Sequence, residues 1–299
     1  MTQLHMLVGA DEAQALPEVR KIRIADLKDA LAKGVDDFWA MPTHVIYLSI
    51  IYPLIGLVLA RWTFSYAVLP MLFPLAAGFA LVGPFAAIGC YELSRRREQG
   101  LDVSWDHAFG VLQSRSIGGI VALGVALMIV FVLWVATAQA LYIATFGYQP
   151  AATIPHFIDQ LFTTRAGWML IIVGNGIGFL FAVMVLAVSV VSFPLLLDRD
   201  VGAATAVITS VHAVLANPIP MALWGLIVAC LLVLGSLPFF LGLAIVLPIL
   251  GHATWHLYRK VVVPDLHPRE EHPQPPKQKR YAAQFPASLF AGEDRSAAQ

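Results

Sequence analysis

Residues 117–141 read IGGIVALGVALMIVFVLWVATAQAL, and this stretch without a single charged side chain decides the class of fold. A helix needs about 20 apolar residues to cross the roughly 30 Å hydrocarbon core of a bilayer. Four more stretches also lack Asp, Glu, Lys and Arg: 43–60, 62–91, 166–197 and 201–258. Runs of this length are typical of membrane-spanning helices, so the sequence predicts a polytopic membrane protein.

The composition excludes several other classes. Hydrophobic residues make up 59% of the chain and charged residues only 13%, about half of the quarter that is usual for soluble domains. The formal net charge is 0, so the chain offers no electrostatic attraction for a nucleic-acid partner. Both cysteines lie in apolar runs without the spacing of a disulfide framework.

The apolar runs divide into six expected spans. Placing the N-terminus in the cytoplasm puts 17 Lys and Arg residues on the cytoplasmic side and 2 outside, so both termini are expected to be cytoplasmic. Three regions follow from this topology: a flexible N-terminus (1–20), a membrane domain (21–260) and a disordered cytoplasmic tail (261–299). The expected spans are 43–61, 66–91, 117–141, 168–194, 219–236 and 238–257.

The division between the last two spans depends on one turn. The run from 219 to 258 would measure about 60 Å as a helix, or two bilayer thicknesses, and must therefore reverse. Gly235-Ser236-Leu237-Pro238 is the expected position, because Gly frees the backbone and Pro cannot continue the helical hydrogen bonding.

A short amphipathic segment precedes each odd-numbered span. Segments 24–39, 103–115 and 201–215 are too short and polar to cross a bilayer, and we expect them to lie in the interface with their apolar sides toward the acyl chains. The second span of each hairpin carries a proline. The expected fold is therefore an all-α bundle of six transmembrane and three interfacial helices, with two alternatives open: a threefold hairpin repeat, or the loose similarity that any hairpins share.

Four stretches resemble a known family: DLKDALAKGVDDFWAMPTH (26–44), GPFAAIGCYELSRRREQG (83–100), PLLLDRDVGAATAVITSVHAVLANP (194–218) and PILGHATWHLYRK (248–260). They are similar to an uncharacterised family of bacterial integral membrane proteins, over roughly residues 20–262. The resemblance implies a bacterial inner-membrane location and supplies no catalytic residues. Some members carry the label cytochrome c oxidase subunit I, but this chain has too few histidines deep in its spans for the catalytic subunit.

Histidines provide the first candidate site. His252 and His256 are four residues apart and share one helix face, and His44 opens the first span at the same expected depth. Such residues could bind haem or a metal. The alternative is that they are ordinary interfacial anchors, with no cofactor at all.

Two further sites are polar. Asn175, between Gly174 and Gly176, lies in the middle of the fourth span, where an amide in hydrocarbon is expected to face the bundle. Asn175 either lies on a transport path or only stabilises the packing of neighbouring helices. Arg95, Arg96 and Arg97 follow the second span and are either a positive-inside anchor or a face that binds lipid or a partner.

No enzyme motif is recognisable in the sequence. The leading hypothesis is a non-enzymatic membrane component that binds a partner complex or lipid through its cytoplasmic basic face. A small transporter or channel is the first alternative, and a haem- or metal-binding accessory of the respiratory chain is the second. The expected partners are the lipid bilayer and another membrane protein complex, and not nucleic acid.

Overall fold

The computed structural model describes residues 16–41, 74–75, 83–84, 87–114, 116–148, 153–238 and 240–264. These residues are helical apart from turns and one isolated antiparallel bridge, between Val19 and Val262. The first expected span and most of the second lie outside the described residues. The chain divides into two units, Met1–Pro264 and Asp265–Gln299, and everything below concerns the first.

Three described helices are long and apolar enough to cross a membrane: α7 (Ile117–Phe146), α9 (Arg165–Ser189) continued by α10 (Ser192–Asp198), and α12 (Pro218–Ser236). They coincide with the third, fourth and fifth expected spans. Thr164 caps α9 by accepting a hydrogen bond from the Gly167 amide. Pro218 is the first residue of α12, where a backbone N–H would have no partner within the helix.

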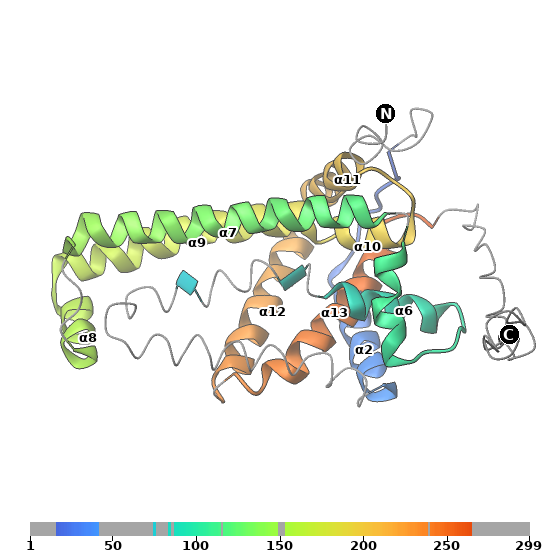
Figure 1. The fold of residues 1–299 in the computed structure, drawn as a ribbon, viewed down its shortest axis with the longest axis horizontal. Helices are drawn as coiled ribbons and strands as arrows, with labels where there is room; N and C mark the ends of the chain where they lie inside the picture. The colour runs from blue at the N-terminus through green and yellow to red at the C-terminus, as the bar shows by residue number, and fades with distance from the viewer. Residues whose placement is uncertain are drawn as a thin grey trace, which may run out of the picture. The chain divides into compact units, whose positions relative to one another are not determined.

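α7 and α9 run side by side as a long hairpin, with α8 (Ile154–Thr163) at its far end (Figure 1). A methyl group added to Gly178 would lie 3.0 Å from the Trp134 ring, so the missing side chain lets this indole pack between the helices. Trp134 is buried, and its Nε1 donates a hydrogen bond to the Pro74 carbonyl at 2.8 Å.

The expected turn at 235–238 is confirmed, because α12 ends at Ser236 and α13 (Leu243–Val261) begins after a tight turn. The expected sixth span is only partly matched. α13 starts five residues later than expected and is not among the helices apolar enough to cross a membrane by length and composition. The physical reason is that two histidines, Arg259 and Lys260 occupy its C-terminal half.

The three amphipathic segments are helices, as expected: α2 (Ile24–Ala40), the 3₁₀ helix η2 (Trp105–Gln113) and α11 (Ala203–Ala216). The expectation that their apolar sides face lipid is wrong for α2. Leu27, Ala30 and Phe38 are buried, and α2 packs along α13. The contact is close because α2 has Gly34 at the crossing, where a methyl group would lie 2.6 Å from Ala253.

α13 is the central element of what we call the helical head, formed by α2, η2, α10, α11, α6 (Ile88–Glu98) and residues 250–261 of α13. α6, α10 and α13 contact one another, while α2 packs on α13 and η2 packs on α6. α6 approaches α13 where a methyl group on Gly251 would lie 2.8 Å from Cys90. The first amphipathic helix thus packs against the last helix and closes the head.

The first and last described segments of this unit meet beside this closure. The Arg20 amide donates to the Val261 carbonyl at 2.7 Å, and the Val263 amide donates to the Glu18 carbonyl at 3.0 Å. Residues 18–20 and 261–263 therefore pair with each other next to α2 and α13.

Candidate functional site

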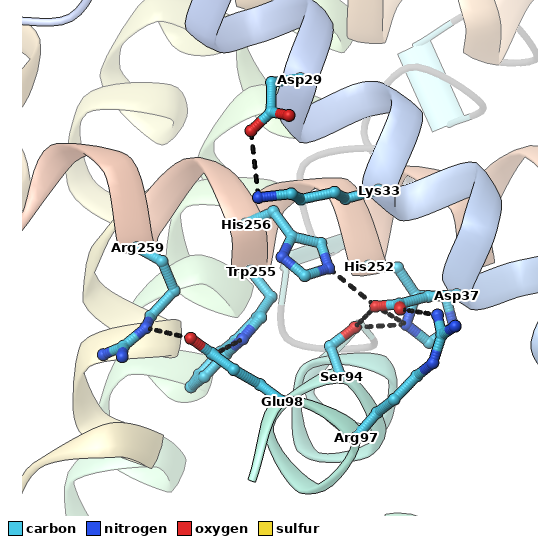
Figure 2. Close-up of polar contacts among 10 residues, drawn as sticks. All are labelled: Asp29, Lys33, Asp37, Ser94, Arg97, Glu98, His252, Trp255, His256 and Arg259. Atoms are coloured by element: carbon cyan, nitrogen blue, oxygen red, sulfur yellow. Dashed lines mark hydrogen bonds and ion pairs between the residues drawn. The ribbon is translucent and has the colours of Figure 1, made fainter. Parts of the chain in front are cut away.

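A buried polar cluster lies where α2, α6 and α13 meet (Figure 2). α2 supplies Asp37, α6 supplies Ser94 and Arg97, and α13 supplies His252 and His256. The two histidines are one helical turn apart, so both imidazoles leave α13 on the side that faces the other two helices. The site is therefore built from three segments that are far apart in the sequence.

The Asp37 carboxylate connects all three helices. Its Oδ2 accepts a hydrogen bond from Ser94 Oγ at 2.5 Å and lies 2.8 Å from His256 Nε2. Its Oδ1 forms an ion pair with the Arg97 guanidinium. Asp37 is only 4% exposed, so these contacts compensate a charge that has been taken out of water.

His252 is completely buried and lies on the other side of Ser94. Its Nδ1 is 2.7 Å from Ser94 Oγ. Because the single Ser94 proton is given to Asp37, we assign the His252 proton to Nδ1, which donates to the serine oxygen. Nε2 is buried, and the imidazole also interacts with the Cys90 backbone of α6.

The surroundings of Asp37 fix its charge state. Burial raises the pKa of Asp37, but hydrogen bonds from His256 and Ser94 outweigh this effect, and the net pKa is lowered. At neutral pH the cluster therefore holds an ionised carboxylate.

A second group of ion pairs extends from the cluster along α13. Glu98 accepts hydrogen bonds from Trp255 Nε1 and Arg259 Nε, both at 3.0 Å (Figure 2). The Tyr258 hydroxyl donates to Asp198 at 2.5 Å, which ties α13 to α10. These contacts hold the helices of the head together at their polar end.

Arg95, Arg96 and Arg97, which were expected to form a basic face, make their contacts inside the head. Arg95 makes two hydrogen bonds to the Glu92 carboxylate, at 2.8 and 2.9 Å. Arg96 donates to the Asp102 carbonyl at 3.0 Å, and Arg97 pairs with Asp37. These charges are compensated inside the head, because α6 places a buried carboxylate, Glu92, one turn before them.

Of the three candidate histidines, His44 lies outside the described residues. His252 Nδ1 contacts Ser94 Oγ, and His256 Nε2 contacts Asp37 Oδ2. Across the described residues, no group of three or more His, Cys, Asp or Glu side chains is arranged to hold a metal.

Asn175 does not turn toward another described helix. The side chain is exposed, and its amide donates to the Ile171 carbonyl of its own helix at 2.7 Å. A polar group at this depth can thus be satisfied locally, without a neighbouring helix. Gly176 has no heavy atom within 4 Å of an added methyl group, and the close approach is made by Gly178 instead.

Sequence reasoning missed Asp37 and Ser94, although one signal was present. Leu27, Ala30, Gly34 and Asp37 repeat at helical spacing, so the aspartate belongs to the apolar face of α2 rather than to its charged face. A carboxylate on a buried face requires a partner. Nothing local to α2 could have identified the partners, since they lie 57 and 219 residues away.

Comparison with known proteins gives one match. The model of a family described as "Predicted integral membrane protein (DUF2189)" matches residues 71–198. The matched segment contains Ser94, Arg97 and the α7–α9 hairpin, whereas Asp37, His252 and His256 lie outside it. No curated protein and no solved structure matches the chain. The match agrees with the apolar helices in describing an integral membrane protein.

Proposed function

We propose that the protein is a non-enzymatic membrane component that binds a partner complex or lipid through the outside of its helical head. The observation that supports this proposal is the closure of the polar cluster. Ser94 and His252 are 1% and 0% exposed, and Asp37 has partners on both oxygens. Side chains arranged in this way hold helices together, and a substrate could not reach them.

The order of the polar groups also argues against a hydrolase. A nucleophilic serine needs a histidine between itself and the carboxylate, so that the imidazole can take the hydroxyl proton. In this cluster Ser94 stands between His252 and Asp37 and gives its proton directly to the carboxylate. The hydroxyl is therefore a structural bridge.

We place the end of the head that carries Asn217 and Val261 at the cytoplasmic face of a bacterial inner membrane, with six spans and both termini inside. The distribution of Lys and Arg supports this topology. The threefold hairpin arrangement is supported by the mutual contacts of α6, α10 and α13, each of which overlaps the second expected span of one hairpin. Reporter fusions after Lys33, Gln99, Gly202 and Lys279 should read cytoplasmic, and one after Pro155 periplasmic. A cytoplasmic signal at Pro155 would refute the six-span topology.

Photo-crosslinking in native membranes tests the binding function. A photoreactive amino acid at Trp39, which is 70% exposed at the end of α2, should yield defined adducts with a protein or a lipid. Tyr148, which is 87% exposed at the end of the α7–α9 hairpin opposite the head, is the matched control position. Equal adduct formation at both positions, or none at Trp39, would contradict the proposal.

A proton-linked transporter is the second candidate, because the buried His252 imidazole belongs to a continuous chain of polar groups. Ser94 and Asp37 connect this imidazole to His256, which forms an unbroken polar chain across three helices. Proteoliposomes loaded with a pH-sensitive dye test this function. Proton uptake that is lost in His252→Leu but kept in His212→Gln, a change at an exposed histidine, would favour transport over binding.

A further inference from the structure

The extended segment that precedes α2 is fixed in place by both ends of the C-terminal hairpin. Arg20 and Glu18 exchange backbone hydrogen bonds with Val261 and Val263. On the other side, the Ile22 amide donates to Asn217 Oδ1 at 2.8 Å, and Asn217 Nδ2 donates to the Arg20 carbonyl at 3.0 Å. The segment is thus a rigid strip and not a loose leader.

The strip presents three cations outward. Val19 and Ile22 turn toward the protein, while Arg20, Lys21 and Arg23 are exposed. None of these three cations takes part in an ion pair within the described part of the chain. They differ in this respect from Arg95 and Arg97, whose charges are balanced by carboxylates. We call Arg20, Lys21 and Arg23 the basic strip.

Two acidic groups lie near the basic strip and do not neutralise it. Glu18 is exposed at its start and makes no ion pair with a described residue. Asp26, in the first turn of α2, has Lys260 as its ion-pair partner, at 3.9 Å. The strip therefore keeps a net positive charge on a fixed backbone.

Asn217 sets the depth of the strip relative to the membrane. This residue is 3% exposed and immediately precedes α12, one of the three helices apolar enough to cross a bilayer. Leu215 and Ile219, on either side of it, are 73% and 72% exposed. Large apolar side chains at the end of a span are typical of contact with acyl chains. A backbone pinned to Asn217 therefore lies at the level of the lipid headgroups.

We infer that the basic strip binds the phosphate headgroups of anionic phospholipids at the end of α12. Three observations carry this inference: cations with no ion-pair partner among the described residues, a backbone fixed by Asn217, and exposed apolar residues at the same level. Guanidinium and ammonium groups donate charge-assisted hydrogen bonds to phosphate oxygens, and the neighbouring apolar residues accommodate the lipid tails. The inference rests on the proposed binding function and names a lipid as one partner.

Native mass spectrometry of the full-length protein in detergent micelles tests this site. Phosphatidylglycerol and phosphatidylcholine are titrated separately, and bound lipids are counted. The wild-type protein should bind phosphatidylglycerol more tightly than phosphatidylcholine. The variant Arg20→Gln/Lys21→Gln/Arg23→Gln should lose most of this preference, by about fivefold for each charge removed, because one cation near an anionic lipid surface contributes about that factor.

The variant Lys277→Gln/Lys279→Gln/Arg280→Gln is the matched control, since it removes the same charge from another part of the sequence. It should keep the wild-type preference. An equal loss in both variants would overturn the inference, because net charge alone would then explain the binding. Displacement of phosphatidylglycerol by an equal concentration of inorganic phosphate would also overturn it, by identifying a plain anion site.

The lipid titration and the crosslinking at Trp39 can give independent outcomes. Loss of the lipid preference as an effect of net charge, together with protein adducts at Trp39, would refute the lipid site and retain the binding function. Absence of Trp39 adducts together with selective phosphatidylglycerol binding would refute the Trp39 surface and retain the lipid site.

Discussion

Asp37 and His256 are 219 residues apart in the sequence, and their side chains are 2.8 Å apart in the fold. This contact joins the first described helix to the last one. It is supported on the same carboxylate by Ser94 and Arg97 of α6, so one aspartate ties together three helices of the head. The charge of Asp37 therefore stabilises the closure of the head.

Replacing Asp37 by Asn should destabilise the head, because Arg97 and His256 lose a charged partner. Removing one member of a fully buried ion pair costs roughly 3–5 kcal/mol. Arg97 is 42% exposed, so solvent recovers part of this loss and we expect about 2 kcal/mol. Thermal unfolding of the protein in micelles measures the change. Asp36→Asn, at the exposed neighbouring residue, should have little effect, and equal destabilisation by both changes would contradict the assigned role.

The stability of the head should fall as the pH drops below 3.8. Burial raises the pKa of Asp37, but hydrogen bonds from His256 and Ser94 outweigh this effect and lower the pKa below its ordinary value of 3.8. The unfolded chain therefore takes up a proton before the folded one. The contribution of Asp37 is complete above pH 3.8 and is lost as the pH falls through the folded pKa.

Melting temperatures recorded at pH values from neutral down to below 3.8 measure this dependence. Asp37→Asn should flatten the curve, whereas Asp36→Asn, at an exposed aspartate, should leave it unchanged. An unchanged slope in Asp37→Asn would show that another group causes the acid sensitivity.

Two glycine substitutions should change the free energy of unfolding in opposite directions. A methyl group on Gly34 would lie 2.6 Å from the Ala253 backbone nitrogen, so Gly34→Ala must push α2 away from α13. We expect a loss of about 1–3 kcal/mol, as for other overpacked contacts. Gly176→Ala meets no atom within 4 Å and should stabilise α9 by up to about 1 kcal/mol, because alanine has the higher helix propensity. The free energy of unfolding of both variants is measured in the same detergent. A change in the same direction for both variants would contradict the packing described.

Asn175→Leu should be tolerated. Its amide bonds only to the Ile171 carbonyl of its own helix, and that carbonyl already belongs to the helical ladder. The expected change in the free energy of unfolding is within about 0.5 kcal/mol, as for other substitutions on an outer surface. Expression level and melting temperature in micelles check this expectation. A large loss of stability would mean that Asn175 has a partner beyond its own helix.

The apolar runs by themselves determined the class of this protein and the position of its described hairpins. Residues 117–141 and 219–236 fall within α7 and α12, and the reversal after Gly235 occurs where Pro238 stops the helix. These features depend on hydropathy, helix length and the backbone chemistry of Gly and Pro, all of which act over a few neighbouring residues. Local physics is enough for such predictions.

Only the tertiary structure decided which polar residues form pairs. The row of Arg95, Arg96 and Arg97 suggests an open basic face, but Glu92 and Asp37 compensate its charge. Arg20, Lys21 and Arg23, in contrast, form no ion pair with any residue that the structure describes. Asn175 looks buried in the sequence and bonds to its own helix instead. The reason is physical: a charge selects its partner by distance and burial, and both are set by how α2, α6 and α13 pack, which no single stretch of sequence encodes.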